Sequence, residues 1–182
     1  MDKAVLAVAL WMWIAATPVS AQSKPLPSSA SMDHDLSAFG VLSYTYRAGT
    51  GAGLGVRYQK TIEREGVLKL SDIRDDIGIE GGVDVVHSRW SSLGTSSVSY
   101  DEIMPVVGGV WNFWLTPQAA LYPKLDLGWR FGWWSDSKAT GTSGYGGFFV
   151  QAAAGIVYRL ERVTLRAELG TGLLRGGVAF AL

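Results

Sequence analysis

The chain has no cysteine and only two histidines among its 182 residues. Without cysteine it can form no disulfide framework, no thiol nucleophile and no cysteine-based zinc site. It also has no excess of charge of either sign, because 16 basic residues balance 16 acidic ones. Nucleic-acid binding needs basic surfaces that neutralise phosphates, so no nucleic-acid partner is expected. Nothing in the sequence calls for a cofactor or a metal.

Glycine and aromatic residues are what the chain has in abundance. It contains 23 glycines, 8 Trp, 7 Tyr and 6 Phe, and 48% of its residues are hydrophobic. Such a composition excludes an intrinsically disordered chain, because it offers ample apolar surface to bury. The length suits one domain.

The first residues resemble an export signal. The stretch from Ala4 to Ala16 is apolar, and the small residues of Val19-Ser20-Ala21 precede Gln22, as a cleavage site requires. About 13 apolar residues are too few for a membrane-spanning helix, which needs about 20. We therefore expect a cleaved signal peptide over residues 1–21, a flexible periplasmic tether rich in Ser and Pro over 22–38, and one domain over 39–182.

Residues 119–135 show the clearest pattern in that domain. Apolar and polar or small residues alternate there, with Leu121, Pro123, Leu125, Leu127, Trp129, Phe131 and Trp133 on one face and Tyr122, Lys124, Asp126, Gly128, Arg130 and Gly132 on the other. A period of two residues indicates a β-strand, because a helix would mix the two sets. The strand is also long for a soluble protein, in which about 5 to 6 residues are usual.

Seven further segments alternate in the same way. They are residues 39–47, 51–62, 76–87, 103–116, 145–160, 162–171 and 174–182. With residues 119–135 they predict an all-β fold, an eight-stranded antiparallel up-and-down transmembrane β-barrel.

The connections between these segments test the topology. If the tether is periplasmic, residues 116–118 and 160–161 form short inner turns, and residues 88–102 and 135–144 form long outer loops, as outer-membrane barrels do. The connection at 48–50 is short for the outside, and the one at 63–75 is long for the inside. Its alternating residues suggest a hairpin extension or a strand overrun.

The direction of the apolar face follows from volume. A barrel of eight strands has an interior just wide enough for side chains, so it cannot hold the bulky rings of every strand. We expect the rings to form two girdles at the membrane surfaces, with an outer set of Tyr44, Tyr46, Trp129, Phe131, Trp133 and Phe148 and an inner set of Tyr58, Trp111, Phe113, Tyr158 and Phe180. The alternative is a soluble, lipocalin-like barrel with an aromatic core.

The last residues carry a family resemblance. Arg175, Gly177, Phe180 and the terminal Leu182 are similar to the assembly signal of small bacterial outer-membrane barrels of the OmpA/OmpX type, in which Phe is the usual last residue. The resemblance implies a monomeric barrel in the bacterial outer membrane. It implies contact with outer-membrane lipid and lipopolysaccharide, and with the barrel assembly machinery during insertion. It says little about activity.

Charged residues fill the predicted lumen face. The basic ones are Arg47, Arg57, Lys124, Arg130, Arg159, Arg162, Arg166 and Arg175, and the acidic ones are Asp76, Glu80, Asp84, Asp126 and Glu168. Buried charges must pair or stay hydrated, so we expect a network of salt bridges that plugs the barrel. The alternative is a narrow, weakly anion-preferring channel for small solutes.

Catalysis is not expected, although some eight-stranded barrels modify lipid A. A hydrolase of the lipid A deacylase kind would need a serine within reach of a histidine. His87 lies near Ser88, Ser91, Ser92, Asp101 and Glu102, whereas His34 lies in the tether. Asp72, Asp75 and Asp76 lack metal-site spacing and suggest a solvated turn. The sequence therefore predicts a structural or surface-interaction role for the outer loops at 88–102 and 135–144.

Overall fold

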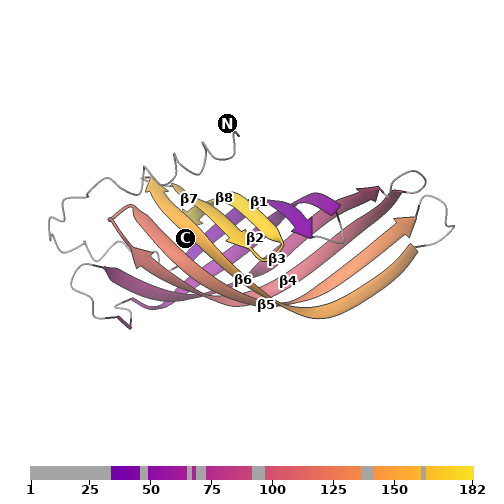
Figure 1. Ribbon diagram of the computed structural model, residues 1–182. Coiled ribbons are helices and arrows are strands. Elements are labelled where there is room, and N and C mark those ends of the chain that lie inside the picture. Colours follow the sequence, from indigo (N-terminus) through magenta and orange to yellow (C-terminus); the bar gives the residue numbers. More distant parts are fainter. Residues whose placement is uncertain are drawn as a thin grey trace, which may run out of the picture.

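The computed structural model describes residues 34–45, 49–64, 67–68, 73–91, 97–136, 142–160 and 163–182. The predicted signal peptide, most of the predicted tether, and Tyr46, Arg47 and Arg162 lie outside the described residues. The described chain forms one barrel, shown in Figure 1.

Eight antiparallel strands close on themselves in sequence order, with β1 pairing with both β2 and β8. They are β1 (His34–Thr45), β2 (Gly49–Glu63), β3 (Arg74–Ser91), β4 (Ser97–Trp114), β5 (Ala119–Asp136), β6 (Thr142–Leu160), β7 (Val163–Gly170) and β8 (Leu173–Ala181). The predicted all-β, eight-stranded, up-and-down barrel is confirmed. Among the described residues, no helix is long and apolar enough to cross a membrane.

The two ends of the barrel differ. The terminal end carries His34 and Leu182, which are joined by a bond from the Leu182 N–H to the His34 carbonyl (3.1 Å). The tip end carries the connections β1–β2, β3–β4, β5–β6 and β7–β8. Strands β3 to β6 are the long ones, and Figure 1 shows them extending past the short β7 and β8. The wall of the barrel is therefore uneven at the tip end.

The prediction of long outer loops at 88–102 and 135–144 is wrong, because strands occupy most of the first range and half of the second. β3 continues to Ser91 and β4 begins at Ser97, while β5 continues to Asp136 and β6 begins at Thr142. The reason is pairing across each hairpin, which continues in register to Ser91↔Ser97 and Ser135↔Thr142. Backbone pairing here overrides a Ser- and Gly-rich composition that favours loops.

The predicted boundary at residue 39 is also wrong, because β1 begins at His34 inside the expected tether. Both edges of this stretch are paired, as in Leu36↔Tyr58 on β2 and Leu36↔Phe180 on β8. Leu36 is exposed and Ser37 is buried, so the alternation of the barrel wall already holds here.

Asp75 and Asp76 are buried in β3 and are not part of a solvated turn. The Asp75 carboxylate accepts hydrogen bonds from the indole N–H of Trp111 (2.8 Å) and from the backbone N–H groups of Val67 (3.0 Å) and Leu68 (3.3 Å). These bonds tie the β2–β3 connection to the barrel wall. A buried carboxylate needs such donors, because its desolvation is otherwise uncompensated.

The outer face of the wall is apolar all the way around. Large hydrophobic side chains of every strand are exposed on it, including Leu42, Leu54, Val56, Ile79, Val83, Val85, Val107, Leu121, Leu125, Leu127, Val150, Leu165, Leu169 and Leu174. Leu54 keeps 72% of its surface accessible, whereas Arg57, three residues further along the same strand, keeps 0%. A soluble protein rarely exposes a contiguous apolar surface of this extent.

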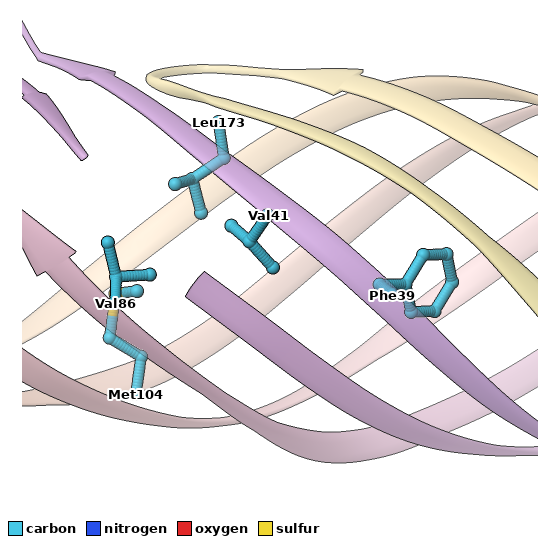
Figure 2. Packing of buried hydrophobic residues seen from close by; sticks show 5 residues of the cluster. All are labelled: Phe39, Val41, Val86, Met104 and Leu173. Carbon is cyan, nitrogen blue, oxygen red and sulfur yellow. The ribbon is translucent and has the colours of Figure 1, made fainter. Parts of the chain in front are cut away.

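A small apolar cluster lies inside the barrel, towards the tip end. Figure 2 shows its members, Phe39 and Val41 of β1, Val86 of β3, Met104 of β4 and Leu173 of β8. The partly buried ring of Phe149 packs against them. This layer fills the interior with side chains that exclude water.

Close approach requires glycine at position 155. Gly155 pairs with Tyr122 across β5 and β6, and a Cβ added there would lie 2.3 Å from the Tyr122 ring and 2.8 Å from the Ala167 carbonyl oxygen. We expect Gly155→Ala to destabilise the barrel by about 1–3 kcal/mol through overpacking. Gly109→Ala is the control, because no atom lies within 4 Å of its added Cβ. Equal unfolding midpoints of the two variants in denaturant would contradict this prediction.

Candidate functional site

Eight charged side chains meet inside the barrel and form what we call the central ion cluster. Its bases are Arg57, Lys124, Arg166 and Arg175, its acids are Glu80, Asp84, Asp126 and Glu168, and all eight are buried. Five strands, β2, β3, β5, β7 and β8, contribute them. Four positive and four negative charges leave the cluster neutral.

Glu80 and Asp84 of β3 each join two or more bases. Glu80 pairs with Lys124 in a short contact, with Nη2 of Arg166 at 2.8 Å and with Nε of Arg57 at 3.5 Å. Asp84 Oδ2 accepts from Nη2 of Arg57 (2.6 Å) and from Nη2 of Arg175 (2.7 Å). Because each acid is shared, the pairs form one continuous network.

Glu168 of β7 closes the network on the opposite wall. Its carboxylate lies 3.2 Å from Arg166, 3.2 Å from Arg175 and 3.4 Å from Lys124. The Tyr122 hydroxyl donates to Glu168 Oε1 at 2.9 Å. Asp126 lies 3.3 Å from the Lys124 ammonium.

Besides Tyr122, two neutral side chains bind the cluster, and sequence reasoning gave neither a role in it. Arg166 donates to the Ser37 hydroxyl (3.0 Å), and Arg175 donates to Oε1 of Gln151 (3.0 Å). Ser37 and Gln151 accept hydrogen bonds from arginine N–H groups and so add to the acceptors that the carboxylates provide. Arginine presents five N–H groups, so a buried guanidinium needs more partners than one acid supplies.

Three residues expected in the charge network lie away from the central ion cluster. At the terminal end, Asp76 accepts from Nδ2 of Asn112 (2.7 Å) and from the indole N–H of Trp114 (2.5 Å), and Arg159 stacks 4.2 Å from the Trp114 ring centroid. At the tip end, Nε of Arg130 lies 3.4 Å from Glu102. The excess of positive charge counted in the sequence is therefore absent from the centre.

The lumen is filled rather than open. A cavity of about 20 Å³ lies at the terminal end beside Asp76 and Arg159, and one of about 80 Å³ lies at the tip end beside Glu102 and Arg130. The central ion cluster and the apolar cluster around Val41 and Met104 lie between them. A hydrated ion would have to displace both layers to cross.

The predicted girdle rings point away from the lumen. Tyr44, Trp129, Phe131, Trp133 and Phe148 are exposed towards the tip end, and Tyr58, Tyr158 and Phe180 are exposed towards the terminal end. Trp111 and Phe113 are half-buried and lie 4.8 Å apart between ring centroids. Trp111 also binds Asp75, a role that sequence reasoning missed.

Residues of the predicted assembly signal alternate across the wall of β8. Arg175 belongs to the central ion cluster and Gly177 follows it on the interior face, whereas Phe180 and Leu182 are exposed. Arg175 therefore pairs with Asp84 and Glu168 in the folded barrel, in addition to any role in the assembly signal.

His87 has one of the two partners that a hydrolytic triad needs. Its Nδ1 lies 2.7 Å from Asp101 Oδ1, and both side chains are exposed on the outer face. Ser88 is buried and faces the interior, and the side chains of Ser91 and Ser92 lie outside the described residues. His34 lies in β1, where its ring contacts the Tyr58 hydroxyl. Among the described residues, no group of His, Asp and Glu could hold a metal ion.

A wall that is apolar outside and charged inside defines the class of protein, a transmembrane β-barrel with a filled lumen. No protein-family model matches the chain, and no curated protein matches it in sequence.

Several solved structures are similar to the chain. One is Ail, the attachment invasion locus protein of Yersinia pestis, in complex with the heparin analogue sucrose octasulfate, with a TM-score of 0.48 and 11% identity over 80% of this chain and 94% of that one. Another is the N-terminal β-barrel domain of Pseudomonas aeruginosa OprF, with a TM-score of 0.42 and 14% identity over 80% and 93% of the two chains. Neisserial surface protein A has a TM-score of 0.42 and 14% identity over 82% and 96%.

Proposed function

We propose that this protein is an integral barrel of the bacterial outer membrane, closed to solutes, that acts as a structural or surface-interaction protein. One observation carries the proposal, the neutral and fully buried central ion cluster inside a wall whose outer face is apolar on every strand. Such a wall is stable in a lipid bilayer, because closure pairs its backbone groups and its side chains match the hydrocarbon.

The orientation in this proposal places the tip end outside the cell. The predicted export signal precedes β1, which leaves the terminal end on the periplasmic side. The working surface is then the ends of the two long hairpins, β3–β4 and β5–β6, which form a surface of paired strands. Outer-membrane lipid and lipopolysaccharide surround the apolar belt, and the barrel assembly machinery recognises the last residues of β8.

We expect the purified protein to leave planar-bilayer conductance at background. The reason is that a charged layer and an apolar layer block the lumen in series. The readout is single-channel recording after reconstitution, with gel mobility before and after boiling to show that the barrel is folded.

A channel would give different results. Discrete conductance steps in the wild type, reduced in anion preference by Lys124→Ala, would contradict closure and favour transport of small solutes. A protein that stays soluble and does not float with lipid vesicles would contradict the membrane assignment itself.

A further inference from the structure

The wall of the barrel has a notch at the tip end, between β6 and β1. β6 begins at Thr142, but β7 pairs with it only from Ala153 onwards. The wall between β6 and β1 consists of the short strands β7 and β8, and it ends here at the β7–β8 turn. Two hydrogen bonds hold this turn, from the Thr171 N–H to the Ala152 carbonyl (3.0 Å) and from the Tyr44 N–H to the Gly172 carbonyl (3.0 Å). No described strand pairs with this edge of β6 beyond that turn (Figure 1).

The cavity at the tip end lies behind this notch, and we call it the tip vestibule. It measures about 80 Å³, and its lining includes Glu102, Arg130, Phe149, Gln151 and the β7–β8 turn. Val150 also lines it, although this side chain belongs to the outward-facing, exposed set of β6. The tip vestibule therefore extends to the edge of β6 that no described strand pairs with, where the notch interrupts the wall.

Two opposite charges, those of Arg130 and Glu102, line the tip vestibule. The Arg130 guanidinium lies 5.4 Å from the Phe149 ring centroid, and its Nε lies 3.4 Å from Glu102 Oε1. The Tyr145 hydroxyl donates to the same oxygen of Glu102. Within the described part of the chain, the two terminal nitrogens of Arg130 and Oε2 of Glu102 have no partner. Both side chains line the tip vestibule, and the Arg130 side chain keeps 36% of its surface accessible, so these groups are open to a ligand.

We propose that the tip vestibule binds a phosphoethanolamine group, with its phosphate on the terminal nitrogens of Arg130 and its ammonium on Oε2 of Glu102. Arginine binds phosphate in a bidentate way through two parallel N–H groups, and an ammonium is the matching donor for a carboxylate oxygen. A ligand with a lone negative charge meets repulsion from Glu102, and one with a lone positive charge meets repulsion from Arg130. A zwitterion satisfies both.

The side opening favours a lipid as the source of this group. The notch is flanked on the outer face by Tyr44 and Phe148, which belong to the outer girdle, so a headgroup at the membrane surface lies level with it. The inference rests on the proposed membrane location, which places lipid at this height. It adds a specific binding site to a surface that otherwise contacts lipid mainly through apolar side chains.

The test uses the full barrel in detergent micelles, with the unfolding temperature as the readout. Phosphatidylethanolamine, phosphatidylglycerol, phosphatidylcholine and free phosphoethanolamine are titrated separately. We expect phosphatidylethanolamine to raise the unfolding temperature at the lowest concentration, because phosphatidylglycerol lacks the ammonium and the phosphatidylcholine nitrogen has no N–H to donate. If free phosphoethanolamine raises the unfolding temperature equally well, the lipid is not the required source of the group. The proposed binding of phosphoethanolamine by Arg130 and Glu102 would still hold.

Glu102→Gln separates a zwitterion from a simple anion. For a zwitterion, Glu102→Gln and Arg130→Gln should each weaken the response to phosphatidylethanolamine by about tenfold or more, since each removes a charge-assisted hydrogen bond. For a simple anion held by Arg130 alone, Glu102→Gln should leave the response to phosphatidylethanolamine unchanged or strengthen it. Arg89→Gln and Asp101→Asn are the matched controls, because both side chains are exposed on the outer face outside the tip vestibule.

Folding of each variant is checked by gel mobility without boiling. Tyr145→Phe removes only a hydroxyl and serves as a milder variant, with a smaller expected loss of the response to phosphatidylethanolamine. No preference of the wild type for phosphatidylethanolamine, or a response of Glu102→Gln to phosphatidylethanolamine that is unchanged or stronger, would overturn the inference. A barrel that floats with vesicles and shows no such preference refutes this site alone, whereas one that does not float refutes the proposed function.

Discussion

Glu80→Gln is expected to lower the free energy of unfolding by about 3–5 kcal/mol, the range for breaking a buried ion pair. Glu80 is 1% exposed and faces Lys124, Arg166 and Arg57. Glutamine has nearly the same shape, so the change removes the charge and leaves three bases short of a partner. The measurement is equilibrium unfolding in urea in the presence of lipid vesicles, followed by tryptophan fluorescence.

Asp101→Asn is the control for this change. It removes one acid from the exposed pair with His87, and such surface pairs contribute about 0–1 kcal/mol. The double variant Glu80→Gln/Lys124→Met should recover part of the loss, since it removes a base together with the acid. If Glu80→Gln and Asp101→Asn lose the same stability, the central ion cluster does not hold the barrel together.

Leu125→Arg is expected to destabilise the barrel in lipid by about 2–4 kcal/mol, because it places a charge on the lipid-facing side near the middle of the apolar belt. Leu125 is exposed on β5, pairs with Gly109 and Ala152, and lies between the Trp111 and Trp129 levels of the wall. The measurement is the free energy of folding into vesicles and the fraction of protein that inserts.

Thr50→Arg provides the comparison at the tip end. Thr50 is exposed at the start of β2, where a charge reaches water and the expected change is about 0–1 kcal/mol. In a soluble barrel both positions would face water, so both substitutions would have the same small effect. Equal effects of the two variants would therefore refute the membrane assignment and restore the soluble alternative.

The charged residues of the central ion cluster could be predicted from the sequence, because alternation assigns each side chain to one face of its strand. Glu80, Asp84, Lys124, Asp126 and Arg166 were all placed in the lumen by their position in the alternating pattern. Alternation cannot give height along the axis. Arg130 and Arg159 share that face and yet lie at opposite ends of the barrel.

The neutral partners could not be predicted, because the pairing between strands decides which of them meet. Ser37 and Arg166 lie 129 positions apart in the chain and are brought together by the closure of β1 on β8. Tyr122 offered one signal, since its long side chain lies opposite Gly155 once β5 and β6 are in register. That register is a property of the folded sheet.

The loops were the weakest part of the prediction. Residues 88–91 and 97–102 have a loop-like composition, but each forms a strand because its partner across the hairpin pairs with it. The same holds for His34 to Ala38, which β2 and β8 pair on both edges. Local composition describes what a segment prefers when alone, and a neighbouring strand changes that preference.

The sequence by itself determined the class of this protein. The two-residue period fixed eight strands and the polarity of their faces, and the volume of the rings required them to lie outside, because side-chain direction alternates strictly along a strand. Only the tertiary structure decided the rest: the balance of the central ion cluster, the apolar layer beside it and the notch that exposes the tip vestibule. These depend on register, strand length and closure, which arise from contacts between residues far apart in the chain.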